Sequence, residues 1–232
     1  MEIGTFLDQI DRRFCRSGIF RAATWDTVRR RGVTKLYAGG LSRDLPQFRT
    51  HLGITPFEAS TRNINHDLCQ PLPIANSSID IFQSEDVFEH IPYSVLPLII
   101  EEVFRVLKPN GLFRLSVPDY RCPVMLDRSV KNSDGDPIFD PGGGGRFIDG
   151  KVVEGGHLWF PTYETVKALL DQSSFAMSGT CRFLHYIDAS GDSVLNPIDY
   201  TFGHIQRTPD HDDRARSPRQ GMSIVVDAIK NQ

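Results

Sequence analysis

The stretch HDLCQPLPIANSSIDIFQSEDVFEHIPYSVLPLIIEEVFRVLKPNGLFRLSVPDY, residues 66–120, decides the fold of this 232-residue chain. Its first strand signal is the apolar run Ile79 to Phe82, which ends in the polar group Gln83-Ser84-Glu85-Asp86. That order is typical of a buried parallel strand that ends in a site. Because open α/β sheets bind ligands outside the carboxyl ends of their strands, we expect function at these strand ends.

The same stretch continues with a helix, a turn and a second strand. From Val95 to Leu107 the apolar residues recur at helical spacing, which predicts an amphipathic helix. Lys108-Pro109-Asn110-Gly111 is a helix stop signal, with a glycine that tolerates positive φ. Leu112 to Val117 then predicts the next strand. Alternation of strand, helix and strand indicates an α/β domain.

The order of these motifs resembles the class I S-adenosylmethionine-dependent methyltransferases of the type 11 kind. The matching residues are Asp67, Leu72-Pro73-Ile74, Asp80, Glu89-His90, Glu102, Arg105 to Pro109, and Gly111. The resemblance implies one Rossmann-like α/β domain, with a mostly parallel seven-stranded sheet, an antiparallel terminal strand and helices on both faces. It also implies S-adenosyl-L-methionine as the cofactor.

A glycine turn after the first strand is where the chain departs from the family pattern. The apolar run Val33 to Tyr37 leads into Ala38-Gly39-Gly40-Leu41, whereas the family has a GxGxG-like turn. Gly39 and Gly40 still permit close approach of the backbone to a ligand, but Leu41 replaces the third glycine. The alternative, an ordinary strand-to-helix loop, stays open.

Two carboxylates are candidates for holding the adenosine part of the cofactor. Glu58 follows Gly39 at an offset usual for the ribose-binding carboxylate, and its alternative role is an exposed loop residue. The resemblance implies that Asp67 contacts the adenine amine, and its alternative role is a turn cap. The complete set of expected cofactor-binding residues is Ala38, Gly39, Gly40, Glu58, Asp67, Leu68, Ser84, Glu85 and Glu89.

Four residues are candidates for the general base that an oxygen or nitrogen acceptor requires, because each is expected near a strand end or a lid. Asp119 and Tyr120 follow the strand that ends at Val117. His90 has a simpler explanation, fixing the start of a helix at Glu89. His157 falls on a histidine of the family pattern and is the leading candidate.

The rest of the chain divides into a helical cap, residues 1–32, and the methyltransferase domain, residues 33–232. Residues 130–157 lack a helical or strand period, and residues 130–157 and 188–221 are expected to form variable lid and substrate segments. Further elements are expected from the apolar spacing and the family pattern: a helix over Pro161 to Leu170 with Thr162 as its cap, a strand opening at Phe175, and a terminal strand over Met222 to Ile229 paired with Phe183 to Ile187.

The composition of the chain indicates which kinds of partner, metal site and membrane segment are not expected. The formal net charge is −3, so nucleic acid is not expected, and no apolar run reaches the about 18 residues of a membrane span. The four cysteines form no CxxC pair, and Asp210 to Arg214 reads as a hydrated loop, so we expect no metal site. The protein is expected to be cytoplasmic, and its oligomeric state is open.

The sequence therefore predicts a methyltransferase that acts on a small molecule or on a glycan or lipid precursor by in-line methyl transfer. One alternative is an inactive member of the fold that serves as a binding or scaffold protein, because Leu41 interrupts the glycine turn. Another alternative is an NAD-dependent Rossmann enzyme. This alternative is less favoured, because the complete GxGxxG fingerprint is missing.

Overall fold

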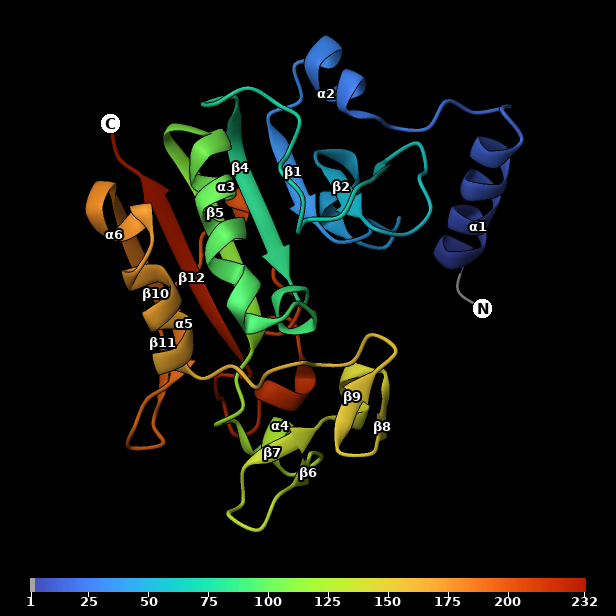
Figure 1. Ribbon diagram of the computed structural model, residues 1–232. Coiled ribbons are helices and arrows are strands. Elements are labelled where there is room, and N and C mark those ends of the chain that lie inside the picture. Colours follow the sequence, from blue (N-terminus) through green and yellow to red (C-terminus); the bar gives the residue numbers. More distant parts are fainter. Residues whose placement is uncertain (1–2) are drawn as a thin grey trace.

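Eight strands form one sheet in the computed structural model, which describes residues 3–232 (Figure 1). The strand order is β11-β10-β12-β5-β4-β1-β2-β3. The strands are β1 (Lys35–Ala38), β2 (Leu52–Thr55), β3 (Asn63–Asn65), β4 (Ile79–Glu85), β5 (Leu107–Pro118), β10 (Gly179–Ile187), β11 (Ser193–Leu195) and β12 (Ser223–Lys230).

The sheet confirms the predicted Rossmann-like architecture. Strands β3, β2, β1, β4 and β5 are parallel and have the doubly wound order, with β12 antiparallel between β5 and β10. The predicted pairing of the terminal strand with the Phe183 to Ile187 segment is therefore correct. The predicted count of seven was one short, because β11 adds an antiparallel edge strand beside β10.

Helices α3 (Leu96–Val106), α5 (Tyr163–Asp171) and α6 (Ser174–Ser178) pack on one face of the sheet (Figure 1). Thr162 is the N-cap of α5, as predicted, because its hydroxyl accepts from the Thr165 amide. The expected strand start at Phe175 was wrong. That residue lies in α6, where its ring packs 6.0 Å from the Phe113 ring of β5.

The opposite face of the same central strands is polar. Arg114 of β5 is fully buried, and its guanidinium donates two bonds of 2.7 and 2.8 Å to the Asp227 carboxylate of β12. It also donates to the carbonyls of Asp199 and Gly203, each at 2.8 Å. Gln83 of β4 donates to the His204 carbonyl at 2.6 Å. A segment without a long helix, residues 199–204, therefore covers this face.

Two small hairpins lie beyond the carboxyl ends of the parallel strands (Figure 1). They are β6 (Val130–Lys131) with β7 (Pro137–Phe139), and β8 (Arg146–Ile148) with β9 (Lys151–Val153). The expectation that residues 130–157 lack strands was therefore wrong. Asp149 and Gly150 both have positive φ, 49° and 76°, in the two-residue turn between β8 and β9. Asp-Gly is a recognised signal for this kind of turn.

Local details of residues 66–120 also differ from expectation. The polar residues Gln83 to Glu85 are inside β4 and buried, so they do not follow the strand as predicted. The predicted turn Lys108 to Gly111 lies within β5, where the pairing with β4 changes register, and Asn110 takes the positive φ of 63° that was expected of Gly111. A side chain on Gly111 would instead meet the Lys108 carbonyl at 2.8 Å, so this glycine allows a close approach of backbone.

The remaining helices are α1 (Ile3–Arg16), α2 (Trp25–Arg31) and the short α4 (Pro123–Leu126). The carboxylates of Asp8 and Asp11 in α1 are buried, and they accept from Arg43 and Thr61 in the loops that follow β1 and β2. Within residues 3–232, no helix combines the length and the apolar character that crossing a membrane requires.

Candidate active site

In the glycine turn after β1, the backbone is accessible to a ligand at Gly40, whereas at Leu41 it is already hydrogen-bonded to a side chain. Gly39 has a φ of 110° and donates to the Ile54 carbonyl at 2.8 Å, directly after the fully buried Ala38. A Cβ added to Gly40 would meet no atom within 4 Å, so a ligand can approach the backbone there. Leu41 is buried, and its N–H and C=O both bond to the Asn63 amide, at 2.7 and 3.0 Å.

The element that follows the glycine turn is a short 3₁₀ turn in place of the helix expected between two parallel strands. The only helical element between β1 and β2 is the 3₁₀ turn Pro46–Arg49. Its buried Gln47 donates to the His204 carbonyl at 2.6 Å, which joins the turn to the segment covering the polar face. Asn63 therefore anchors the glycine loop at Leu41, and Gln47 anchors the 3₁₀ turn that follows to His204.

Glu58 and Asp67 both lie at the surface near the ends of β2 and β3. Glu58 forms a 3.0 Å ion pair with Arg16 of α1 and lines a cavity of about 540 Å³ with Phe57 and Asn65. The Asp67 Oδ1 accepts from the Cys69 amide at 2.9 Å, so the turn-cap role is present. Its other oxygen makes no hydrogen bond to residues 3–232 and is open to a ligand. Leu68 is buried in the core behind Asp67.

Ser84 and Glu85 at the end of β4 are both buried. Glu85 Oε1 accepts from the amides of Gln206 and Arg207, at 2.7 and 3.3 Å. Burial, followed by the charge of Asp86, raises the pKa of Glu85 to about 7. The structure therefore uses Glu85 to hold the segment that crosses the end of β4.

A second group of polar side chains gathers beside the end of β4. Glu89 and His90 lie in the 3₁₀ turn Phe88–His90, and His157 comes from the chain that leaves β9. The Leu158 amide donates to the Glu89 carbonyl at 2.8 Å, and the Trp159 indole donates to the Phe88 carbonyl at 2.9 Å. These bonds place His157 against Glu89, with 3.6 Å between Nε2 and Oε1.

A buried hydrogen-bonded chain continues from His157. Its Nδ1 lies 2.5 Å from the Tyr120 hydroxyl, which lies 2.5 Å from Asp140 Oδ2. Arg128 donates to the same oxygen at 2.6 and 3.1 Å. Burial opposes the charge of Asp140, but the bonds from Arg128 and Tyr120 outweigh it and lower the pKa of this carboxyl. Burial, followed by the charge of His90, lowers the pKa of His157 to about 4.

Asp119 is separate from this chain. It is fully buried, and its two oxygens accept from the amides of Arg121 and Ile187, at 2.9 and 2.7 Å. Burial raises the pKa of Asp119 to about 6. The carboxylate therefore joins the end of β5 to the end of β10, and no oxygen is left without a partner.

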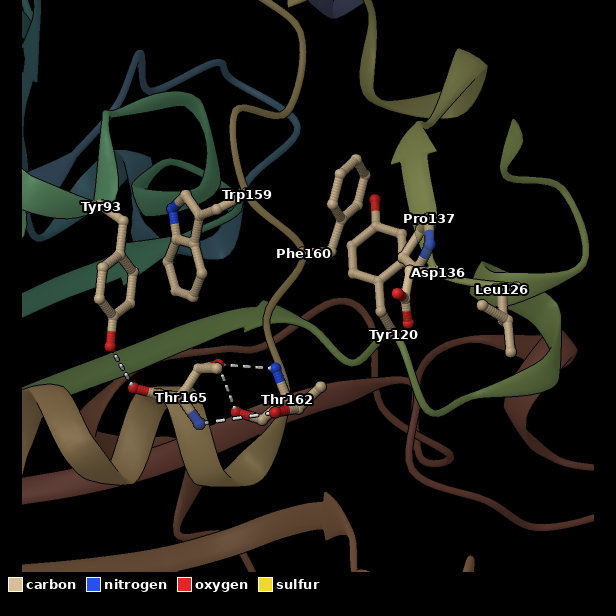
Figure 2. Close-up of a pocket in the computed structure, with 10 residues that line it drawn as sticks. Tyr93, Tyr120, Leu126, Asp136, Pro137, Trp159, Phe160, Thr162 and Thr165 are labelled. Atoms are coloured by element: carbon tan, nitrogen blue, oxygen red, sulfur yellow. Dashed lines mark hydrogen bonds between the residues drawn. The ribbon is translucent and has the colours of Figure 1, made fainter. Parts of the chain in front are cut away.

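A cavity of about 660 Å³ lies beside the buried chain (Figure 2). Aromatic side chains make much of its wall: Tyr93, Tyr120, Trp159 and Phe160. The Tyr93 hydroxyl donates to the Thr165 carbonyl at 3.0 Å, and its ring packs on Trp159 with the centroids 5.0 Å apart. Tyr120 is the residue that belongs both to the cavity wall and to the chain reaching His157.

Asp140 and Arg128 are the members of this group that the sequence did not reveal. Neither has a local motif, because the bond between Tyr120 and Asp140 and the bond between Arg128 and Asp140 depend on how residues 121–139 fold back. The Asp149-Gly150 turn signal could have identified the hairpin β8–β9. That hairpin leads directly into His157.

Part of the chain matches a known protein family. A family model described as a methyltransferase domain matches residues 45–115. A search of curated protein sequences found no match.

Solved structures with a similar arrangement have low sequence identity to this chain. A candidate S-adenosylmethionine-dependent methyltransferase from Listeria monocytogenes has a TM-score of 0.49 and 14% identity, covering 86% of this chain and 91% of its own. An S-adenosylmethionine-dependent methyltransferase from Archaeoglobus fulgidus has a TM-score of 0.47 and 12% identity, and the match covers 97% of this chain and 99% of that one. A third structure is the 1,6-didemethyltoxoflavin-N1-methyltransferase of Burkholderia thailandensis with bound 1,6-didemethyltoxoflavin and S-adenosylhomocysteine. Its TM-score is 0.45 and its identity is 11%, and the match covers 100% of this chain and 92% of that one.

The family match includes β2, β3, β4 and α3, and Glu58, Asp67 and Glu89 lie in the segments between these elements. The sheet outside the match has the strand order that the same fold requires. Residues 45–115 thus match the model of a methyltransferase domain, and the predicted resemblance of the chain to the class I S-adenosylmethionine-dependent methyltransferases is confirmed.

Proposed function

We propose that this protein transfers a methyl group from S-adenosylmethionine to a small-molecule acceptor. The methyltransferase-domain match over residues 45–115 is the observation that carries the proposal. The open space at Gly40 supports it, because the backbone there can receive a ligand without any rearrangement of side chains. The free oxygen of Asp67 and the cavity beside Glu58 offer polar contacts at neighbouring strand ends.

When bound, S-adenosylmethionine supplies an electrophilic methyl group on a sulfonium. The task of the protein is then to align the acceptor and to exclude water, which contributes about 7–11 kcal/mol in favourable cases. The aromatic walls of the cavity beside Tyr120 suit an acceptor that carries a flat or apolar ring. Tyr120 and His157 remain the candidates for handling the acceptor's proton, because they connect to this cavity.

Titration calorimetry with S-adenosylmethionine and S-adenosylhomocysteine tests the proposal. We expect saturable binding that is weaker in Gly40→Val, because the added side chain fills the open space while Gly40 has no positive φ to strain. Asp67→Ala is expected to weaken binding as well. Asp171→Ala, an exposed aspartate on α5 paired with Lys167, is the matched control. Folded protein that gives no heat with either compound at millimolar concentration would refute the proposal.

The second candidate function is a binding or scaffold protein that keeps the fold without turnover. Two observations favour it, because each shows an expected cofactor-loop group bonded within the fold. The N–H and C=O of Leu41 are hydrogen-bonded to the Asn63 amide, and the Glu85 carboxylate accepts from the amides of Gln206 and Arg207. Cofactor binding without methylation across a broad panel of acceptors would support this candidate. Transfer of a radiolabelled methyl group to any acceptor would exclude it.

A further inference from the structure

We propose that Glu89, His90 and His157 form a binding site for a divalent transition-metal ion, with Zn²⁺ as the reference ion. One ligand atom from each of the three side chains lies within 4.8 Å of the other two. The proposal departs from the sequence-based expectation of no metal. It does not rest on methyl transfer, because the cofactor contacts proposed above are at Gly40, Glu58 and Asp67, and it assigns Glu89 and His157 the role of ion ligands in place of the cofactor-binding and proton-handling roles expected of them from the sequence.

Glu89 is the strongest indication that a cation belongs here. Its side chain is completely buried, and neither carboxylate oxygen has a hydrogen-bond partner within residues 3–232. Two nearby carboxylates are paired with arginines, Asp86 with Arg207 at 2.6 Å and Asp140 with Arg128 at 2.6 Å. Glu89 forms no ion pair with a lysine or an arginine of residues 3–232. A buried carboxylate without a partner costs several kcal/mol, and coordination of a cation removes that cost.

Both imidazoles are held in a tautomer that leaves one nitrogen for an ion. His90 Nδ1 lies 2.7 Å from the Gly155 carbonyl, which can only accept, so Nδ1 carries the proton and Nε2 has the lone pair. Tyr120 gives its single proton to Asp140, so its oxygen accepts from His157 Nδ1. The lone pair of His157 is then on Nε2, 3.6 Å from Glu89 Oε1.

The surroundings resemble the supporting shell of a metal site. Metal-bound histidines ordinarily donate their second N–H to a carbonyl or toward a carboxylate, which orients the ring and raises its basicity. His90 has the carbonyl of Gly155, and His157 has Tyr120 backed by Asp140. Asp140 is itself fixed by Arg128 and by the Gly142 amide at 2.8 Å.

The donor set decides the class of ion. Two imidazoles and one carboxylate suit Zn²⁺ or another first-row transition ion, whereas Mg²⁺ and Ca²⁺ prefer oxygen ligands. A tetrahedral ion with ligands at about 2.0–2.1 Å holds the ligand atoms about 3.4 Å apart, so ligand atoms that now lie within 4.8 Å of one another must approach by up to about 1.4 Å. Three protein ligands leave one position open, and the adjoining wall of the aromatic cavity contains Tyr120 and Trp159. An acceptor heteroatom in that position would be polarised by the ion.

The test uses full-length protein without a histidine tag, treated with a chelator and then titrated with ZnCl₂ by calorimetry. We expect one Zn²⁺ per chain with a dissociation constant in the micromolar range or tighter. Glu89→Gln and His157→Gln are each expected to weaken binding at least about 100-fold, because each removes a ligand. Tyr120→Phe keeps all three ligands and is expected to weaken it about 10–100-fold.

His211→Gln is the matched control, because His211 is a partly buried histidine outside the cluster. It should bind Zn²⁺ as the unaltered protein does. Circular dichroism establishes that each variant is folded, and Co²⁺ uptake should give the visible absorption bands of a tetrahedral site. Absence of stoichiometric binding by the folded unaltered protein would overturn the proposal, whether or not the variants fold. Equal affinity in Glu89→Gln, His157→Gln and the unaltered protein would also overturn it, whereas neither result bears on S-adenosylmethionine binding.

Discussion

The two faces of the central sheet use the same strands in opposite ways. On one face, Phe113 of β5 packs on Phe82 and Phe175 beneath three helices. On the other face, its neighbour Arg114 is equally buried but bonds to Asp227 and to the carbonyls of residues 199 and 203. Apolar packing is not directional, whereas hydrogen bonds specify position. The polar face therefore holds an irregular segment, residues 199–204, in place by hydrogen bonds. The helices on the other face need only a stripe of apolar side chains to pack on the sheet.

Arg114→Ala should cause the largest loss of stability, because it leaves the Asp227 carboxylate and two carbonyls without their donor. We expect the free energy of unfolding to fall by about 3–5 kcal/mol. Urea unfolding followed by circular dichroism measures this change. Hydrogen exchange should also become faster in residues 199–208, and unchanged exchange there would contradict the view that Arg114 positions this segment.

Much of the apolar face could be predicted from the sequence, and little of the polar face could. The apolar spacing of residues 95–107 identified α3 because a helix on a sheet needs a periodic stripe. Arg114 gave no such signal, because its partners Asp227, Asp199 and Gly203 are distant in the sequence. The same limitation applied to the site.

Glu89 and His157 were identified as candidates singly, by resemblance to a family. Their proximity depends on the path of the chain through two hairpins, and the Glu89–His157 cluster could not be assembled without it. Glu85 was expected at a ligand, because it ends a buried strand. Its actual partners are backbone amides of a loop that has no regular pattern.

Glu85→Gln should remove a pH-dependent loss of stability on the polar face. Burial and Asp86 raise the folded pKa of Glu85 to about 7, above its ordinary value of 4.5, although Arg207 and two amides oppose the shift. The folded state therefore favours the protonated form, and stability falls as the pH rises from 4.5 to about 7. The loss is complete above that range and is on the order of 3 kcal/mol at most.

Urea unfolding of both proteins from about pH 4 to about pH 8 measures the difference. Glu85→Gln should gain stability relative to the unaltered protein as the pH increases through this window. A difference that does not vary with pH would show that Glu85 ionises without cost in the fold.

The double variant Arg114→Met, Asp227→Leu sharpens the comparison by making the polar face more like the apolar one. Replacement of both members of a buried ion pair is commonly close to neutral, because no charge is left buried. The carbonyls of Asp199 and Gly203 still lose their donor, which costs about 1–3 kcal/mol in total. We expect a stability between those of Arg114→Ala and the unaltered protein, measured by urea unfolding. A double variant less stable than Arg114→Ala would contradict the assignment of the large loss to the unpaired Asp227.

Ile100→Val on α3 should have the smallest effect and supplies the contrast from the apolar face. Ile100 is fully buried in the core, and removal of one methylene costs about 0.5–1.5 kcal/mol. Because the contact has no charge and no direction, the loss should be the same at about pH 4 and about pH 8. Hydrogen exchange in residues 199–208 should stay at the rate of the unaltered protein once the change in global stability is subtracted. Faster exchange confined to that segment would mean that the two faces are coupled, and the division of roles between helix packing and loop positioning would then be wrong.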